Sequence, residues 1–330
     1  MIKKITSILI AMVLMFTGVG VWSTTVVRAE SSSSGSGNKL KIVATIFPEY
    51  DWTREILGDH LKDVDLTLLL DNGTDLHSFQ PAVKDIMKVS SCDLLIYVGG
   101  ESDQWIEDAL KSAANPDMKT INLMETLKDF IKEEETVEGM QEKHHSHEED
   151  EKEYDEHVWT SLRNASAAAE VIADTLAELD PENSDIYKEN LRSYQGELSS
   201  LDNEYQKTVD QSTHKTLLFA DRFPFRYLVD DYGISYYAAF SGCSAESEAS
   251  FKTITFLAEK VDELGLKEVF TIEKSDDRIA ETVIENTRDK DQKVAVLNSM
   301  QSITSEEIAD GTTYLSIMED NLKVLKAALK

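Results

Sequence analysis

One apolar stripe runs without interruption along residues 183–211. Its members recur at intervals of four and three residues: Tyr187, Leu191, Tyr194, Leu198, Leu201 and Tyr205. This spacing predicts one amphipathic helix of about 27 residues, roughly 40 Å long. An ordinary core helix would show the same stripe. The length of this one, and its place between two halves of the chain, favour a rigid connector.

Short β-type runs alternate with helical patterns on both sides of the stripe. We expect strands at residues 40–46, 64–70, 94–98, 120–123, 216–220, 234–240, 268–272 and 293–297. Alternating strands and helices imply parallel sheets covered by helices. The predicted fold is therefore α/β, with two similar lobes, each a four-stranded mainly parallel sheet flanked by helices, joined by one long rigid linking helix.

The lobe boundaries follow from this pattern. We place the N-terminal lobe at residues 40–182, the linking helix at residues 183–211 and the C-terminal lobe at residues 212–330. An acidic, histidine-rich loop at residues 133–156 interrupts the N-terminal lobe. Two domains is the usual expectation for a chain of this length.

The N-terminal segment is expected to direct export. Two lysines precede an apolar run with small residues at its end, so residues 1–29 have the layout of a secretory signal peptide. An uncleaved membrane anchor is the alternative. Residues 30–39, rich in Ser and Gly, predict a flexible tether. No cysteine precedes Cys92, so we expect an extracytoplasmic protein, at the cell surface or in the periplasm, that is secreted or anchored by its signal rather than by a lipid.

The net charge of −29 argues against a nucleic-acid partner, because such a surface could not neutralise phosphates. It suits an exported protein that handles a solute. The chain has two cysteines, Cys92 and Cys243, and no CxxC motif, so neither a redox motif nor a cysteine zinc site is indicated. Exported proteins can form disulfides, so the sequence is compatible both with a Cys92–Cys243 bond and with two free thiols.

Four of the seven histidines fall within residues 141–159. They are His144, His145, His147 and His157, and twelve acidic residues occupy residues 133–156. Imidazoles and carboxylates both bind divalent cations, although a solvated acidic loop with incidental histidines would look similar. His157 differs from the other three because the apolar pattern resumes directly after it. We therefore expect an auxiliary, weak metal-binding tract at the first three and one fixed ligand at His157.

Ligands in open α/β sheets bind beyond the carboxyl ends of the strands. His77 follows the second expected strand, Asp221 and Arg222 follow the fifth, and Glu273 follows the seventh. Each residue taken alone is more often structural. Two histidines from one lobe and two carboxylates from the other nevertheless predict a metal site between the lobes.

Several longer motifs add to this pattern: residues 46–50, residues 73–81 with His77, residues 100–105, residues 155–159 with His157, and residues 314–322. Together they resemble the metal-binding receptors of ABC importers for zinc and manganese, and the resemblance covers nearly all of the chain after residue 40. An acidic, histidine-rich insertion before the second motif is typical of the zinc-type members.

The resemblance implies two lobes joined by the helix at residues 183–211 and metal ligands at His77 and His157. It also implies a His or Glu ligand after the first strand of the second lobe, where this chain has Arg222, which cannot bind a metal. The neighbouring Asp221 can, and Glu273 matches the fourth, acidic position. We expect Arg222 to pair with a carboxylate instead, and the distant His214 not to substitute.

The resemblance implies a receptor that captures Zn²⁺ in the cleft and delivers it to an ABC-type membrane permease, acting as a monomer. Manganese is the alternative cargo, and a metal-sequestering or adhesive surface protein is the alternative function. A metal hydrolase is disfavoured, because there is no HExxH motif and residues 242–246 lack the second glycine of a nucleophile elbow. We therefore expect no enzyme.

Overall fold

The computed structural model describes residues 39–141, 153–244 and 248–330, and residues 39–330 form one compact unit. The predicted signal peptide, nearly all of the tether and the tract with His144, His145 and His147 lie outside the described residues. Within the described ranges, no helix has both the length and the apolar character needed to cross a membrane.

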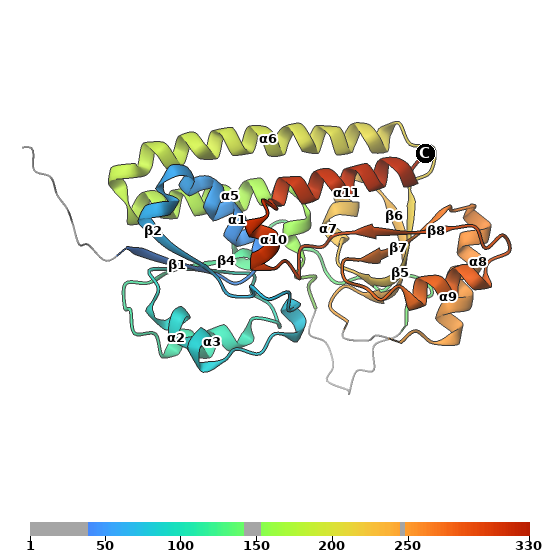
Figure 1. Ribbon diagram of the computed structural model, residues 1–330, viewed down its shortest axis with the longest axis horizontal. Coiled ribbons are helices and arrows are strands. Elements are labelled where there is room, and N and C mark those ends of the chain that lie inside the picture. The colour runs from blue at the N-terminus through green and yellow to red at the C-terminus, as the bar shows by residue number, and fades with distance from the viewer. Residues whose placement is uncertain (1–38, 142–152, 245–247) are drawn as a thin grey trace, which may run out of the picture. The chain divides into compact units, whose positions relative to one another are not determined.

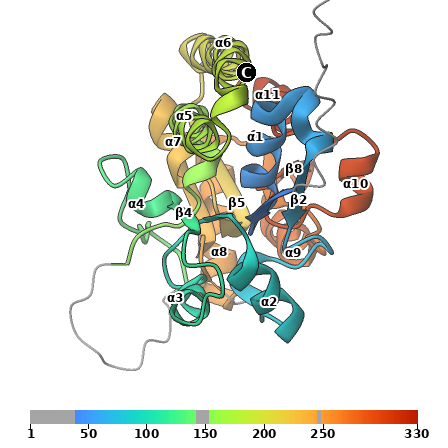
Figure 2. The same cartoon turned by 90° about the vertical axis from the view of Figure 1, so that its left-hand side faces the viewer.

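The N-terminal sheet has the strand order β2-β1-β3-β4, and all its strands are parallel. The strands are β1 (Leu40–Ala44), β2 (Val64–Leu68), β3 (Leu94–Tyr97) and β4 (Lys119–Asn122). Its helices are α1 (Phe47–Leu57), α2 (Val83–Ser91), α3 (Gln104–Lys111) and the short α4 (Leu123–Thr126). Helices cover both faces of this sheet (Figure 2), which explains the continuous apolar runs of its strands.

The C-terminal sheet repeats this topology, with the order β6-β5-β7-β8 and all strands parallel. The strands are β5 (Thr216–Phe223), β6 (Ser235–Ser241), β7 (Glu268–Ile272) and β8 (Lys293–Leu297). Its helices are α7 (Arg226–Tyr232), α8 (Phe251–Leu264) and α9 (Arg278–Asn286). The short α10 (Ser305–Ala309) instead meets the N-terminal lobe, where the backbone N–H of Ser305 donates to the Asp71 carbonyl oxygen. The predicted fold class is confirmed.

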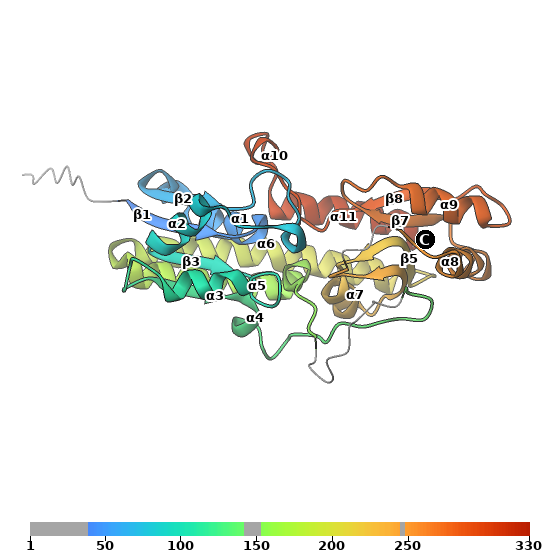
Figure 3. The same ribbon diagram turned by 90° about the horizontal axis from the view of Figure 1, so that it is seen from below.

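The long helix α6 (Ser184–Asp210) connects the lobes, and the two sheets lie along it one after the other (Figures 1 and 3). All six residues of the predicted stripe are buried. In the N-terminal lobe α6 packs against α5 (Leu162–Leu179) and α1. In the other direction it meets the last helix, α11 (Tyr314–Ala328), where the Tyr205 hydroxyl donates to the Met318 carbonyl oxygen over 2.6 Å.

Helix α11 is a second connection between the lobes. Its first residue, Tyr314, donates its backbone N–H to Asp51 Oδ2 of α1 over 2.7 Å and its hydroxyl to the Trp159 carbonyl oxygen over 2.7 Å. The side chains of Tyr314, Trp159 and Asp51 are all fully buried. The N-terminal lobe is therefore anchored to α11 as well as to α6, which restricts how far the lobes can move apart.

Strand β5 corrects one sequence expectation. It extends to Phe223 rather than ending at residue 220, so Asp221 and Arg222 lie within the strand and not in a loop after it. The pairing of β5 with β6 shifts register between Phe219 and Arg222, which marks a β-bulge. A bulge redirects the side chains around it, so counting residues along a regular strand misplaces them.

Candidate metal centre

His77 lies on a short 3-10 turn, Leu76–Ser78, between β2 and α2. The turn is fixed because Leu76 is buried in the core and Asp75 Oδ1 accepts the backbone N–H of His77 over 2.9 Å. The imidazole Nδ1 lies 2.7 Å from Ser102 Oγ. With its proton at Nδ1 and donated to Ser102, the ring presents the Nε2 lone pair to a metal ion.

His157 is held by the same local arrangement. Asp155 Oδ1 accepts both the backbone N–H and the Nδ1–H of His157, each over 2.8 Å. The imidazole is fully buried, and the next turn is anchored by Trp159, whose indole N–H donates to the Ser299 carbonyl oxygen of the second lobe over 2.8 Å. A carboxylate on Nδ1 fixes the tautomer that leaves Nε2 free for a metal.

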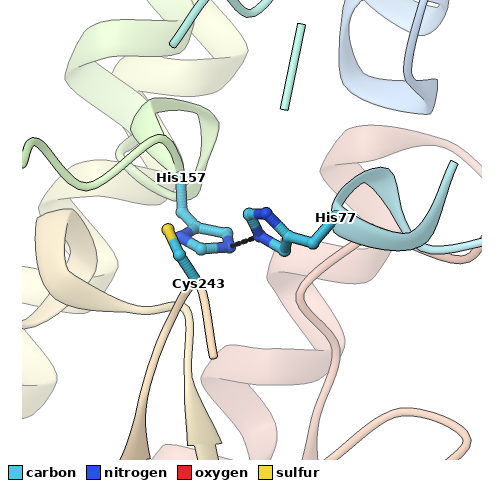
Figure 4. Close-up of side chains that lie close together, drawn as sticks. All are labelled: His77, His157 and Cys243. Atoms are coloured by element: carbon cyan, nitrogen blue, oxygen red, sulfur yellow. Dashed lines mark hydrogen bonds between the residues drawn. The ribbon is translucent and has the colours of Figure 1, made fainter. Parts of the chain in front are cut away.

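The two imidazoles meet through their Nε2 atoms, which are within hydrogen-bond distance of each other. Nε2 of His77 lies 3.0 Å from Nε2 of His157 (Figure 4). Two imidazole nitrogens bound tetrahedrally to one zinc ion at about 2.0–2.1 Å would be about 3.3 Å apart. A separation of the rings by a few tenths of an ångström would therefore suffice to admit the ion.

The electrostatic environment keeps one of these rings neutral. Burial, together with the neighbouring His157, lowers the pKa of His77 to about 3. Burial also opposes protonation of His157, but Asp155 and Glu156 outweigh it and raise the pKa of that ring above its usual value. Neutral imidazole is the form that binds metal, so His77 is ready to bind throughout the physiological pH range.

A cysteine that the sequence argument did not assign to the site completes the cluster. Among the described residues, His77, His157 and Cys243 form a group whose potential ligand atoms lie within 4.8 Å of one another (Figure 4). Cys243 follows β6 in the second lobe. Cys243 has no CxxC spacing that would mark it as a ligand, and its position shortly after a strand is the one sequence signal that could have found it. The structure keeps both cysteines free, so Cys243 forms no disulfide with Cys92.

The two predicted carboxylate ligands lie beside this group rather than in it. Asp221 and Glu273 line a neighbouring cavity of about 390 Å³ between the lobes. The Asp221 oxygens accept the backbone N–H groups of Arg222 (2.8 Å) and Ile272 (3.3 Å). Glu273 accepts the backbone N–H of Ser299 (2.7 Å) and its hydroxyl (2.8 Å). Their assignment as ligands stays a prediction.

Arg222 pairs with a carboxylate, as expected. Its Nη2 lies 2.7 Å from Asp75 Oδ2, and Asp75 uses its other oxygen to hold the backbone of His77. Because Arg222 belongs to the second lobe and Asp75 to the first, this ion pair joins the lobes directly beside the histidine pair. His214, by contrast, is exposed before the start of β5 and is not part of the group.

A second cavity, of about 650 Å³, reaches His77 and Cys243. Five glutamates line it: Glu101, Glu107, Glu134, Glu153 and Glu156. A cavity lined by one sign of charge raises the local concentration of ions of the opposite sign. The approach to the histidine pair therefore favours cations.

Gly242 packs so closely against His157 that it has no room for a side chain. A Cβ atom at this position would lie 2.9 Å from the Phe223 carbonyl oxygen and 3.0 Å from Cε1 of His157. Replacing Gly242 with Ala is therefore expected to displace the imidazole or the β6 loop and to weaken zinc binding about tenfold, as measured by competition with a fluorescent chelator.

Gly196 provides the matched control. It lies on the exposed side of α6, and a Cβ there would meet nothing within 4 Å. Gly196→Ala should stabilise the helix by about 1 kcal/mol and leave zinc affinity unchanged. Equal zinc affinity in the Gly242 and Gly196 variants would show that the close packing against His157 does not matter for binding.

The known proteins that this chain resembles are zinc-uptake and zinc-binding proteins. The family model described as ZnuA, the periplasmic zinc-uptake complex component A, matches residues 42–328. The high-affinity zinc uptake system protein ZnuA of Bacillus subtilis is 28% identical over 309 residues, which are 91% of this chain and 91% of that protein. The zinc-binding lipoprotein AdcA of Streptococcus pneumoniae strain R6 is 30% identical over 90% of this chain.

The match to AdcA covers 57% of that protein, so the chain spans little more than half the length of the streptococcal relatives it matches. Among solved structures, the Zn(II)-bound ZnuA-like domain of Streptococcus pneumoniae AdcA is similar, with a TM-score of 0.69 and 28% identity. That likeness covers 88% of this chain and 99% of the domain.

Proposed function

Since the chain belongs to the ZnuA family of zinc-uptake components, we propose that it is an extracytoplasmic receptor that captures Zn²⁺ between its lobes and delivers it to an ABC-type membrane permease. The observation that supports this most directly is the pair of imidazoles with facing Nε2 atoms 3.0 Å apart. Each ring has its Nδ1 engaged by a neighbouring group, as metal-bound histidines do.

His77 and His157 are the proposed ligands from the first lobe. Asp221 and Glu273 remain the proposed second-lobe ligands. Each carboxylate accepts hydrogen bonds from its own lobe and still has lone pairs that can bind an ion. A crystal structure with zinc bound decides this, because either carboxylate within about 2.2 Å of the ion would be a ligand.

Native mass spectrometry tests the proposed cargo. Purified protein is titrated with zinc and, separately, with manganese, and one tightly retained zinc per chain is expected. Zinc should be retained more strongly than manganese, as the general order of divalent metal affinities predicts. Transfer of the bound ion to purified permease would then distinguish a receptor from a protein that only sequesters metal. If manganese were retained as strongly as zinc, the result would favour the alternative function, a manganese receptor of the same family.

The tract at His144, His145 and His147 is proposed to bind additional zinc weakly. The three histidines stand among charged residues, without the apolar pattern that follows His157. Ordering such a segment around an ion costs conformational entropy, so its affinity should be lower than that of the buried pair. Replacing the three histidines together with Ala should lower the total zinc bound at excess metal and leave the tightest site unchanged, as measured by the same titration.

A control for this experiment is Ser146→Ala, which alters the same segment without removing a potential ligand. It should bind as much zinc as the unmodified protein. Loss of the tightest site in the triple variant would mean that the tract supplies primary ligands, and the separation into a strong and a weak site would be wrong.

A further inference from the structure

We propose that Cys243 supplies a thiolate ligand from the second lobe. The site would then prefer thiophilic divalent ions and bind zinc and cadmium far more tightly than manganese. This inference rests on the proposed receptor function and specifies its ligand set. In this alternative ligand set the thiolate takes the place of the Asp221 and Glu273 carboxylates, which makes the site softer.

The position of Cys243 supports a role at the histidine pair. Its sulfur lies within 4.8 Å of a ring nitrogen of His77 and of a ring nitrogen of His157, and Cys243 reaches them from the opposite lobe (Figure 4). A sulfur and an imidazole nitrogen bound to the same zinc ion would be about 3.6 Å apart. The required approach is therefore on the order of 1 Å, which is small for two lobes that close on a ligand.

The loop that carries Cys243 is held against the ligands. Gly242 packs on the His157 ring, as described above, and the backbone N–H of Ser244 donates to the Ser241 carbonyl oxygen over 3.3 Å to close a turn. The backbone N–H of Cys243 itself lies 3.4 Å from Glu134 Oε1 of the first lobe. Contacts with both lobes thus place the thiol at the boundary that the ion would bridge.

A thiolate ligand would change which ions the site prefers. When the ion binds, the S–H bond breaks, the sulfur forms a bond to the metal, and the proton leaves to solvent. Thiolate is a soft ligand that favours zinc over manganese, which prefers carboxylate and water oxygens. Two imidazoles and one thiolate also leave a tetrahedral zinc ion with one open position, from which the ion can be handed on.

The second cysteine serves as a matched control. Cys92 is fully buried in the N-terminal core, where its thiol donates to the Val89 carbonyl oxygen and contacts the Met118 sulfur. It is not part of the group around the histidines. Cys92→Ser keeps a hydrogen-bond donor at that position, so it tests for general effects of removing a thiol.

Cobalt provides a spectroscopic test, because a cobalt–thiolate bond gives a strong near-ultraviolet charge-transfer band. The band is expected in the unmodified protein and in Cys92→Ser, and it should be absent from Cys243→Ser and Cys243→Ala. Zinc affinity in both Cys243 variants should fall at least tenfold while manganese affinity changes little. Circular dichroism melting of all variants shows whether each one folds.

Two outcomes separate this inference from the proposed function. Tight cobalt and zinc binding by the unmodified protein without a charge-transfer band, or with a band that survives in Cys243→Ser, would overturn the thiolate assignment and leave the receptor function standing. Failure of the folded, unmodified protein to retain zinc or cobalt would overturn both.

Discussion

Replacing either His77 or His157 with Ala is expected to weaken zinc binding at least a hundredfold, or about 2.8 kcal/mol. Each substitution removes one of the two nitrogens that face each other across 3.0 Å, and no other histidine in the described part of the chain lies in that group. Isothermal titration with a competing chelator measures the loss. Each variant should still fold, since removing one imidazole leaves the apolar core residues of both lobes in place.

His214→Ala is the matched control for this pair, because that histidine is exposed and precedes β5. Its zinc affinity should equal that of the unmodified protein. Unchanged affinity in both the His77 and the His157 variants would contradict the assignment of the site, whatever the affinity of the control.

Replacing Asp155 with Asn should weaken zinc binding by about ten- to a hundredfold, although Asp155 is not in the group of potential ligands. Its carboxylate accepts the Nδ1–H of His157 over 2.8 Å and so keeps the Nε2 lone pair directed toward the ion. An Asn at this position can donate an N–H to Nδ1 instead, which would favour the tautomer with its proton at Nε2, where the metal should bind.

The readouts for this variant are zinc affinity and the imidazole tautomer, which nitrogen-detected NMR reports. Asp108→Asn, which removes the same charge from an exposed position on α3, is the control and should alter neither. If His157 keeps its proton at Nδ1 and zinc affinity is unchanged in Asp155→Asn, the carboxylate does not orient the ligand.

The local pattern of the chain was sufficient to predict the main elements and to single out the two histidines of the candidate site. The stripe on α6 follows from the period of the α-helix, and the strands of both sheets follow from short apolar runs between turn residues. His77 could be identified because it follows an expected strand, and His157 because the apolar pattern resumes directly after it. The structure adds that each backbone is held by an aspartate two residues earlier.

The second half of the site depends on contacts between residues far apart in the chain. The bulge in β5 changes where Asp221 and Arg222 point, and the partner of Arg222 is Asp75 of the other lobe. Cys243 approaches the histidines because two loops of different lobes pack together, with Gly242 against His157. Neither the bulge nor this packing has a period or spacing that can be recognised in the sequence, because both arise from how the two folded lobes meet.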